Sequence, residues 1–127
     1  MANILIVEDE AIVALENKMN LSALGHKVSA ITSSAENAII AFHENTPDLI
    51  LLDIKLKGMM DGIEAIHEIR KHSAVPVIFI TGNSDTKTLQ RVKEISNVFY
   101  LQKPILLNEL TNAVNTMLSK NSSPLTA

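Results

Sequence analysis

The sequence predicts an α/β fold: a (βα)5 doubly wound three-layer sandwich in which helices cover both faces of a parallel sheet. Three observations predict this class. Short apolar runs without polar alternation recur along the chain, as in strands buried on both faces. Segments of helical length and period lie between these runs. The length, 127 residues, fits one domain with a sizeable core.

Five apolar runs have the character of buried strands, and the second is the weakest candidate. They span residues 4–7, 28–31, 49–52, 77–80 and 98–102. The first run is followed by Glu8 and Asp9, and the third by Asp53. The fourth is followed by Thr81 and the fifth by Lys103. If the strands are parallel, these polar groups meet at the sheet edge where open α/β sheets bind ligands.

The first helix is predicted over residues 10–24. Ile12, Leu15 and Met19 fall on one stripe, the pattern of a helix that packs against a core. Gly25 directly after it is a favourable residue for ending a helix. The second helix is predicted over about residues 35–43, with Ser33 or Ser34 as its cap and a break at residues 45–47.

Three further helices follow from caps and apolar spacing. The third is predicted over residues 61–72, the fourth from a cap at Ser84 or Asp85 to about residue 95, and the fifth over residues 107–118. The side chains expected to face inward are Ile63, Ile66, Ile69, Leu89, Val92, Leu110, Val114, Met117 and Leu118. Residues 1–118 would then form one domain, and residues 119–127 a flexible C-terminal tail or linker stub.

The composition argues against several classes of protein. The formal net charge is −3, whereas a nucleic-acid surface is normally basic, so we expect no direct nucleic-acid binding. The absence of cysteine excludes disulfides and thiolate metal sites. No apolar run has the length of a membrane span, and the first residues enter a strand without a signal-type leader. We therefore expect a cytoplasmic protein that does not bind membranes.

Three carboxylates point to a divalent cation. If the first and third strands are neighbours, Asp53 faces Glu8 and Asp9, and three like charges so placed would raise one another's pKa values. A hard cation removes this conflict, and Mg²⁺ takes oxygen ligands while it keeps positions open for phosphate. For Glu8 and Asp9 an alternative remains, because acids at a helix N-terminus complement the helix dipole. Asp53 is harder to explain by packing, since an unpaired buried charge is costly.

Thr81 and Lys103 add the groups that a phosphoryl ligand needs. A hydroxyl donates a hydrogen bond to a phosphate oxygen, and an ammonium supplies a compact positive charge. Gly82 leaves room for a ligand, and Pro104 allows a cis bond in a tight turn that aims Lys103. Asp53 can then act as a nucleophile that forms an aspartyl phosphate. The simpler alternatives are a strand-forming Thr81 and an ordinary exposed Lys103.

With these motifs in this order, the chain resembles a receiver domain of the two-component response-regulator family over about residues 3–118. The resemblance implies a flavodoxin-like parallel five-stranded sheet with strand order 2-1-3-4-5. It also implies phosphoryl transfer to Asp53 from the phosphohistidine of a sensor histidine kinase or phosphotransfer protein. Such a domain catalyses only its own phosphorylation and dephosphorylation and is not otherwise an enzyme.

The resemblance assigns metal and rate-tuning roles. Asp9 and Asp53 are expected to ligate Mg²⁺, for which Mn²⁺ could substitute, and Glu8 to ligate it directly or through water. The family often has Asp where this chain has Glu8. The backbone carbonyl of Lys55 would complete the protein ligands. Lys55 lies two residues after Asp53, and Asn83 lies two residues after Thr81. At these two positions the family tunes the lifetime of the phosphoryl group.

The resemblance also implies a switch. Thr81 and Lys103 would contact phosphoryl oxygens, and Tyr100 matches the family's switch aromatic. Thr81 would move toward the phosphoryl group, Tyr100 would turn inward, and the surface of the fourth helix, fifth strand and fifth helix would be remodelled. The alternative for Tyr100 is an edge-strand residue with a solvent-exposed hydroxyl.

Three other functions compete with this one. An aspartate-based, magnesium-dependent phosphatase would need a second Asp two residues after Asp53, where Lys55 stands. A flavin-binding module would need a phosphate loop after the first strand, where the acids at residues 8–10 would repel phosphate. The last is a receiver-like protein-interaction module that works without phosphorylation.

The expected partners are the kinase or phosphotransfer protein and a downstream protein target or output domain. The expected oligomeric state is a monomer or a dimer that forms on phosphorylation. A stand-alone regulator and a fragment of a longer regulator or hybrid kinase both fit the sequence. The cognate kinase, the signal, the output and the phosphoryl lifetime have no signature in the residues.

Overall fold

The computed structural model describes the backbone of residues 1–82 and 85–122, with side chains through Ser119. Asn83, Ser84 and residues 123–127 lie outside this description. The elements are β1 (Asn3–Val7), α1 (Ala11–Ala23), β2 (Lys27–Thr32), α2 (Ala35–Glu44), β3 (Leu49–Asp53), α3 (Gly62–Ile69), β4 (Val77–Thr81), α4 (Thr86–Lys93), β5 (Val98–Gln102) and α5 (Leu107–Ser122). The alternation of strands and helices is the predicted (βα)5 order.

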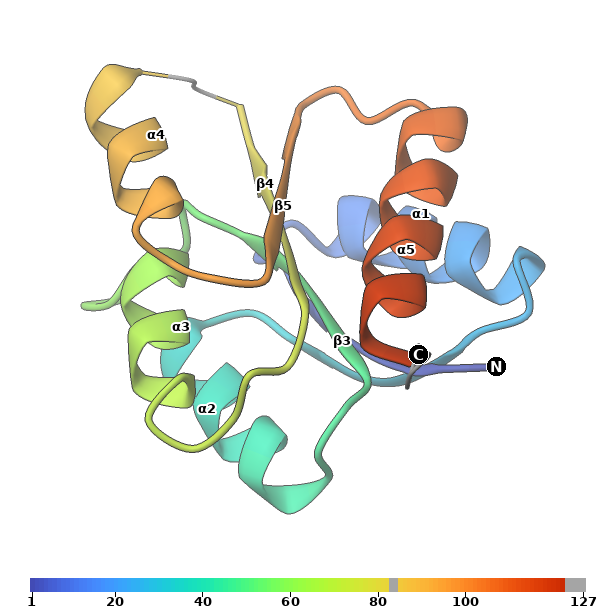
Figure 1. Ribbon diagram of the computed structural model, residues 1–127, viewed down its shortest axis with the longest axis horizontal. Helices are drawn as coiled ribbons and strands as arrows, with labels where there is room; N and C mark the ends of the chain where they lie inside the picture. The colour runs from blue at the N-terminus through green and yellow to red at the C-terminus, as the bar shows by residue number, and fades with distance from the viewer. Residues whose placement is uncertain (83–84, 123–127) are drawn as a thin grey trace.

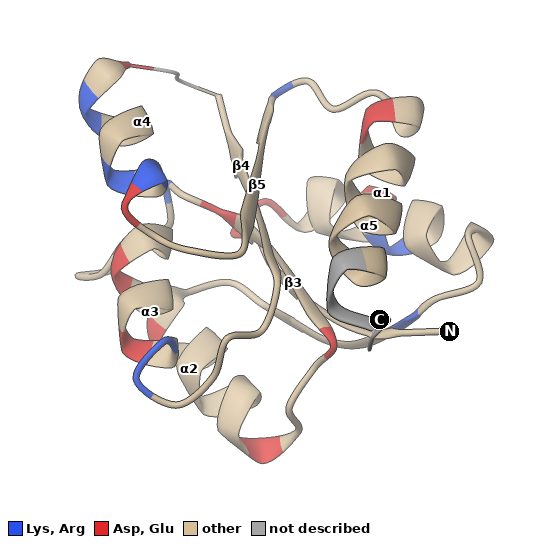
Figure 2. Cartoon of the chain, viewed as in Figure 1, with Lys and Arg blue, Asp and Glu red and all other residues tan. Residues whose placement is uncertain are grey.

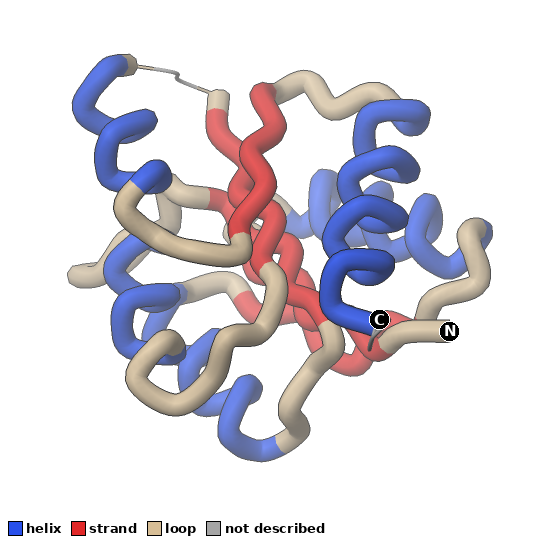
Figure 3. The backbone as a smooth tube through the Cα atoms, viewed as in Figure 1, coloured by secondary structure: helices blue, strands red, loops and turns tan. Residues whose placement is uncertain are grey.

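The five strands form one parallel sheet in the order β2-β1-β3-β4-β5. Figure 1 shows α1 and α5 on one side of the sheet and α2, α3 and α4 on the other. Figure 3 shows the same three layers, with the strands as a red band between blue helices. The predicted fold class and the strand order implied by the family resemblance are therefore confirmed.

Two apolar cores fill the space between the sheet and its helices. Strands β3 and β4 are buried along their whole length, which explains their lack of polar alternation. The core under α2, α3 and α4 includes Leu5, Leu52, Ile66, Phe79 and Val92. The core under α1 and α5 includes Ile4, Ile6, Leu21, Leu110 and Met117.

The prediction that one stripe of α1 packs inward was wrong. Ile12, Leu15 and Met19 are 82%, 54% and 64% exposed. The buried residues of α1 are Ala14, Asn17 and Leu21. Both sets have the same i, i+3, i+7 spacing, so periodicity does not separate them. The small side chain of Ala14 lets the helix approach a sheet face already filled by isoleucines.

The other helices agree with the sequence in most respects. Ser34 caps α2, with its Oγ accepting from Asn37 N at 3.1 Å, and Asp85 caps α4, with Oδ1 accepting from Thr88 N at 2.7 Å. The inward residues of α3, α4 and α5 are buried, apart from Leu89 and Leu118, which are half-buried. Helix α3 is shorter than predicted, because Asp61 is its cap and the chain turns after Ile69.

Helix α5 continues to Ser122, past the predicted end at Leu118. The backbone of residues 119–122 is therefore helical. Beyond it, residues 123–127 lie outside the description, so the flexible tail stays a prediction. No helix in the described ranges is both long enough and apolar enough to cross a membrane.

Candidate functional site

The carboxyl ends of four strands bring the predicted polar residues to one edge of the sheet. Strand β1 pairs with β3, with Val7 opposite Leu52, so the acids that follow each strand become neighbours. Strand β4 pairs with β5, with Thr81 opposite Gln102. Lys103 N donates to the Thr81 carbonyl oxygen at 2.8 Å, which fixes the start of the β5–α5 loop beside β4.

Glu8, Asp9 and Asp53 form an acid cluster. Each offers a carboxylate oxygen, and these oxygens all lie within 4.8 Å of one another. Glu8 and Asp53 are only 3% and 5% exposed. Glu8 Oε1 is buried and accepts no hydrogen bond from the described residues. Oxygen-only donors that include a buried oxygen without a hydrogen bond fit a hard divalent cation such as Mg²⁺.

Lys103 reaches into this cluster. Its Nζ lies 2.8 Å from Asp53 Oδ2, 3.4 Å from Glu8 Oε1 and 3.8 Å from Glu10 Oε1. The Lys103–Pro104 peptide bond is cis, as the sequence allowed. The reading of Lys103 as an ordinary exposed lysine was wrong, because its side chain is only 24% exposed and paired with carboxylates. Glu10, which the sequence analysis counted only among the acids that would repel a flavin phosphate, is a contact that it missed.

Burial sets the electrostatics of the cluster. It raises the pKa of Glu8 to about 7, and the nearby Asp53 charge adds to the rise. The Glu10 N–H, which donates to Glu8 Oε2 at 3.1 Å, and the Lys103 ammonium oppose it. Burial alone would lower the pKa of Lys103, but hydrogen bonding and attraction to Asp53 and Glu8 raise it overall. The acids therefore keep the ammonium charged.

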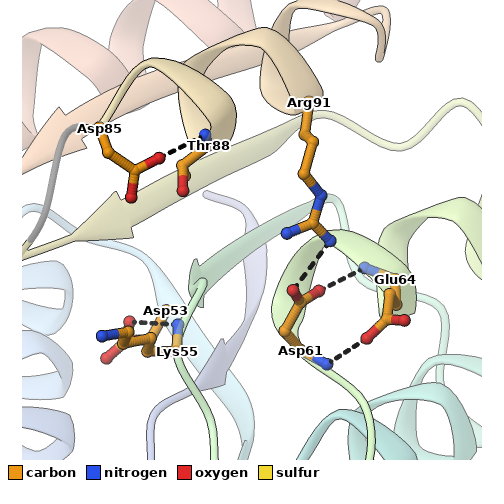
Figure 4. Close-up of polar contacts among 7 residues, drawn as sticks. All are labelled: Asp53, Lys55, Asp61, Glu64, Asp85, Thr88 and Arg91. Carbon is orange, nitrogen blue, oxygen red and sulfur yellow. Dashed lines mark hydrogen bonds and ion pairs between the residues drawn. The ribbon is translucent and has the colours of Figure 1, made fainter.

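Local backbone contacts orient Asp53. Its Oδ1 accepts from Lys55 N at 3.1 Å, as Figure 4 shows. Gly62 N donates to the Ile54 carbonyl at 2.8 Å. A Cβ on Gly62 would collide with the Asp53 carbonyl oxygen and lie 3.1 Å from Ile54 Cα. Only glycine lets the start of α3 pack this closely against the end of β3.

Thr81 and Tyr100 lie on the neighbouring strands β4 and β5. Thr81 is 3% exposed, and Tyr100 stands opposite Phe79 in the β4–β5 pairing. The Tyr100 hydroxyl is buried and has no hydrogen-bond partner among the described residues. Burial raises the pKa of Tyr100, and the Asp85 charge adds to this. The alternative of a solvent-exposed hydroxyl was therefore wrong.

Of the remaining predicted site residues, Gly82 and Lys55 are described by the structure and Asn83 is not. Gly82 is exposed, and nothing lies within 4 Å of where its Cβ would be, so the space beside it is open as expected. The Lys55 side chain is exposed. Asn83 lies outside the described residues, so its rate-tuning role stays a prediction.

Fold and site together define a doubly wound α/β domain in which a cluster of acidic residues that could hold a metal ion lies at the carboxyl edge of the sheet. The sequence profile of the response regulator receiver domain matches residues 4–115. The chain therefore belongs to the response regulator receiver domain family. The predicted family membership is confirmed.

Individual relatives agree with this family. The chain is 36% identical to the transcriptional regulatory protein MalR of Bacillus subtilis over 117 residues, which cover 91% of this chain and 49% of MalR. It is 26% identical to the transcriptional regulatory protein PdtaR of Mycobacterium tuberculosis over 117 residues, or 92% of this chain and 57% of PdtaR. The chain thus spans about half the length of the curated relatives it matches.

Solved structures give the same result. The signal receiver domain of a modulated diguanylate cyclase from Desulfovibrio desulfuricans superposes with a TM-score of 0.87 at 32% identity, covering 94% of this chain and 95% of that one. The receiver domain of the PhyR response regulator from Erythrobacter litoralis superposes with a TM-score of 0.85 at 27% identity, covering 99% and 96%.

Proposed function

We propose that this chain is the phosphoacceptor of a two-component phosphorelay. A sensor histidine kinase or phosphotransfer protein donates the phosphoryl group. The P–N bond of its phosphohistidine breaks as a carboxylate oxygen of Asp53 forms a P–O bond, and the freed histidine nitrogen keeps the bonding pair. The observation that carries the proposal is the position of Asp53, buried between two acids and the Lys103 ammonium.

Glu8, Asp9 and Asp53 would hold Mg²⁺, and the Lys55 carbonyl would complete the protein ligands. Mn²⁺, which also prefers oxygen ligands, could substitute. When bound, the cation would neutralise charge on the transferring phosphoryl oxygens. The three carboxylate oxygens within 4.8 Å of one another support this assignment, because a cation would compensate both the burial that raises the pKa of Glu8 and the repulsion from Asp53 that adds to it.

The other side chains would position the phosphoryl group. The Lys103 ammonium, 2.8 Å from Asp53 Oδ2, is close enough to contact a phosphoryl oxygen carried by that carboxylate. The Thr81 hydroxyl would donate to another phosphoryl oxygen. Lys55 and Asn83 would control access of water to the aspartyl phosphate and so set its lifetime.

Phosphorylation would change the surface formed by α4, β5 and α5. Thr81 would move toward the phosphoryl group and Tyr100 would fill the space behind it. Figure 2 shows basic residues (blue) along α4, so an acidic partner surface would complement this helix. A downstream protein or an output domain would recognise the remodelled surface, and a phosphorylation-linked dimer could form there.

Receiver domains are regulatory phosphoacceptors rather than enzymes in the ordinary sense. This chain fits that role, because Lys55 stands where an aspartate-based phosphatase would need a general acid. We therefore propose that its catalysis is limited to its own phosphorylation and dephosphorylation. A cytoplasmic location, where such kinases present their phosphohistidine, is part of the proposal.

Intact-mass spectrometry after incubation with a small acyl-phosphate donor tests the proposal. The expected result is one added phosphoryl group that requires both Mg²⁺ and Asp53, and that is absent in Asp53→Asn. Glu68→Gln, which alters an exposed acid on α3, is a matched control and should be phosphorylated normally. If neither the acyl phosphate nor a histidine kinase gives an adduct on folded protein, the chain is instead an interaction module that works without phosphorylation.

A further inference from the structure

One buried polar side chain has no part in the site described above. The buried polar residues of the described ranges are Glu8, Asn17, Asp53 and Thr81, and all but Asn17 belong to that site. Asn17 is only 5% exposed, and its side chain makes no hydrogen bond to another described residue. Because a buried amide loses its hydrogen bonds to water on folding, it normally has partners within the protein. The Asn17 amide therefore indicates a partner from outside the chain.

Asn17 lines a pocket of about 400 Å³ between α1, α5 and the loop from β5 to α5. This volume falls in the range of pockets that bind small molecules. The apolar part of its wall includes Ile105 and Leu106 of the loop and Leu110 of α5. Lys103 borders this pocket and also contacts the acid cluster, but no member of the acid cluster lines the pocket. The pocket is therefore separate from the proposed metal site.

The α1 wall of the pocket carries a row of polar side chains. Val13, Glu16, Asn17 and Asn20 all line it, and their spacing is that of one helical face. The two amides offer oxygen acceptors as well as N–H donors, and Glu16, which is exposed, adds an acidic group. An apolar wall with a few convergent polar groups is the usual composition of a ligand site.

The charges around the pocket favour a cation over an anion. Lys103 is the one basic residue in the described lining, and its ammonium is already engaged by three carboxylates outside the pocket. The amino end of α5 would favour an anion, but Glu109 of its first turn already faces that end, with Oε1 accepting from Leu106 N at 3.3 Å. Glu16 adds a negative charge, so a ligand that carries a positive charge complements this lining.

We propose that this pocket binds a small organic amine. The protonated nitrogen of the amine pairs with Glu16 and donates a hydrogen bond to Asn17 Oδ1. Its apolar body packs against Leu106 and Leu110. Binding thus gives the buried Asn17 amide the partner that the chain does not supply. The proposal does not rest on phosphorylation of Asp53, and binding is measured on the unphosphorylated chain.

NMR titration of the ¹⁵N-labelled chain with 2-phenylethylamine is the first test. The expected result is saturable binding, with a dissociation constant of about 1 mM or lower for so small a ligand. The shifts should appear at the Asn17 side-chain amide and at the backbone amides of Ile105 and Leu106. 2-Phenylethanol and 3-phenylpropanoate share the apolar body, but they should bind at least about tenfold more weakly, because they lack the charge-assisted hydrogen bonds.

Three outcomes of this titration overturn the proposal. The first is the absence of saturable binding. The second is binding of 3-phenylpropanoate as tight as that of the amine, which would make the pocket an anion site or an unselective apolar one. The third is a set of shifts confined to the amides around Asp9 and Asp53, which would place the amine in the acid cluster instead.

Asn17→Leu separates a ligand-binding role from a structural one. Leucine has a similar size but no polar group, so the variant should bind the amine at least about tenfold more weakly. Its free energy of unfolding without ligand should be no lower than that of the wild type, because a buried polar group without a partner is lost. A less stable Asn17→Leu protein that still binds the amine as tightly as the wild type would show that Asn17 is structural, and would overturn the proposal.

Glu16→Gln tests the charge at a position where the fold is not at risk, because Glu16 is exposed. Affinity for 2-phenylethylamine should fall about two- to fivefold, the usual effect of one exposed ion pair. Affinity for 2-phenylethanol should not change. Glu44→Gln, at an exposed acid that ends α2, is the matched control and should bind the amine like the wild type. Equal amine affinity in Glu16→Gln and Glu44→Gln contradicts the proposed pairing.

Discussion

Arg91 of α4 reaches Asp61, the cap of α3, and its Nη2 donates to Asp61 Oδ2 at 2.8 Å (Figure 4). The other oxygen, Asp61 Oδ1, accepts from Glu64 N at 2.8 Å, and Glu64 Oε1 accepts from Asp61 N at 2.8 Å. One carboxylate thus caps α3 and holds α4. Because Asp61 ends the loop that follows Asp53, this contact joins the phosphoacceptor loop to the helix that we propose as part of the output surface.

We expect Arg91→Ala to loosen α4 with little loss of global stability. The Arg91 and Asp61 side chains are 43% and 29% exposed, so the pair contributes no more than about 1 kcal/mol to the free energy of unfolding. Backbone amides of α4 should exchange faster with solvent, as measured by hydrogen exchange, while those of α5 should not change. Lys87→Ala on the same helix is the control, and equal exchange in both variants would contradict the link.

Asp61→Ala should cost more than Arg91→Ala, because it also removes the cap of α3, which is worth about 1 kcal/mol. The double variant should be no less stable than Asp61→Ala alone, since the arginine has then already lost its partner. Urea unfolding of the four proteins in this cycle measures the coupling. Additive losses would show that the two residues act independently.

Gly62→Ala should destabilise the fold by about 1–3 kcal/mol, the usual range for overpacking. The new methyl group would collide with the Asp53 carbonyl oxygen, so we also expect slower phosphorylation of Asp53. Gly82→Ala is the steric control, because nothing lies within 4 Å of its Cβ position. Denaturant unfolding gives the comparison, and a Gly62→Ala protein as stable as Gly82→Ala would contradict this close packing.

The positions of the strands and of the site residues were predictable because both are marked by short stretches of the sequence. Short apolar runs gave the buried strands, and the polar residue after each run reached the same edge since all the strands are parallel. The orientation of α1 was not predictable in this way. Its two candidate stripes, one with Leu15 and one with Leu21, have identical spacing, and only the shape of the sheet beneath selects between them.

Polar contacts between residues far apart in the sequence could not be predicted either. Arg70, at the end of α3, donates to the Ser96 carbonyl at 2.9 Å and the Asn97 carbonyl at 3.3 Å, and so fastens the α4–β5 loop. Partners of this kind are backbone atoms more than twenty residues away, which no residue pattern marks. The Asp61 cap did have a signal, because Glu64 stands three residues later as in a capping box.

His26 should make the fold less stable in mild acid. Its Nδ1 accepts from Ala2 N at 3.2 Å, and burial, with the charged N-terminus nearby, lowers the pKa of His26 below 6.5. A folded state with a lowered histidine pKa keeps its full stability above pH 6.5 and loses it as the pH falls through the folded pKa. NMR titration should place the His26 midpoint below 6.5, and His26→Asn should flatten the pH dependence of the unfolding free energy. A midpoint at or above 6.5 would contradict this.

Removing the Lys103 charge should destabilise the fold, because it leaves the repulsion between the acids of the cluster uncompensated. The ammonium lies within 3.8 Å of three carboxylates, and two of them, Glu8 and Asp53, are almost fully buried. Lys103→Met leaves those carboxylates without a counter-charge, so in a metal chelator we expect it to lower the free energy of unfolding by up to about 3–5 kcal/mol. Lys87→Met, at an exposed position, should be neutral.

Magnesium should then restore more stability to Lys103→Met than to the wild type. A cation that binds only the folded state stabilises it in proportion to its affinity, and the variant has no ammonium to compete for the same oxygens. Thermal unfolding with Mg²⁺ and with chelator gives the two shifts. Adding Glu8→Gln to Lys103→Met should shrink the shift again, because one ligand charge is lost. A Mg²⁺ shift in Lys103→Met equal to or smaller than that of the wild type would mean that the ammonium and the cation do not share this site.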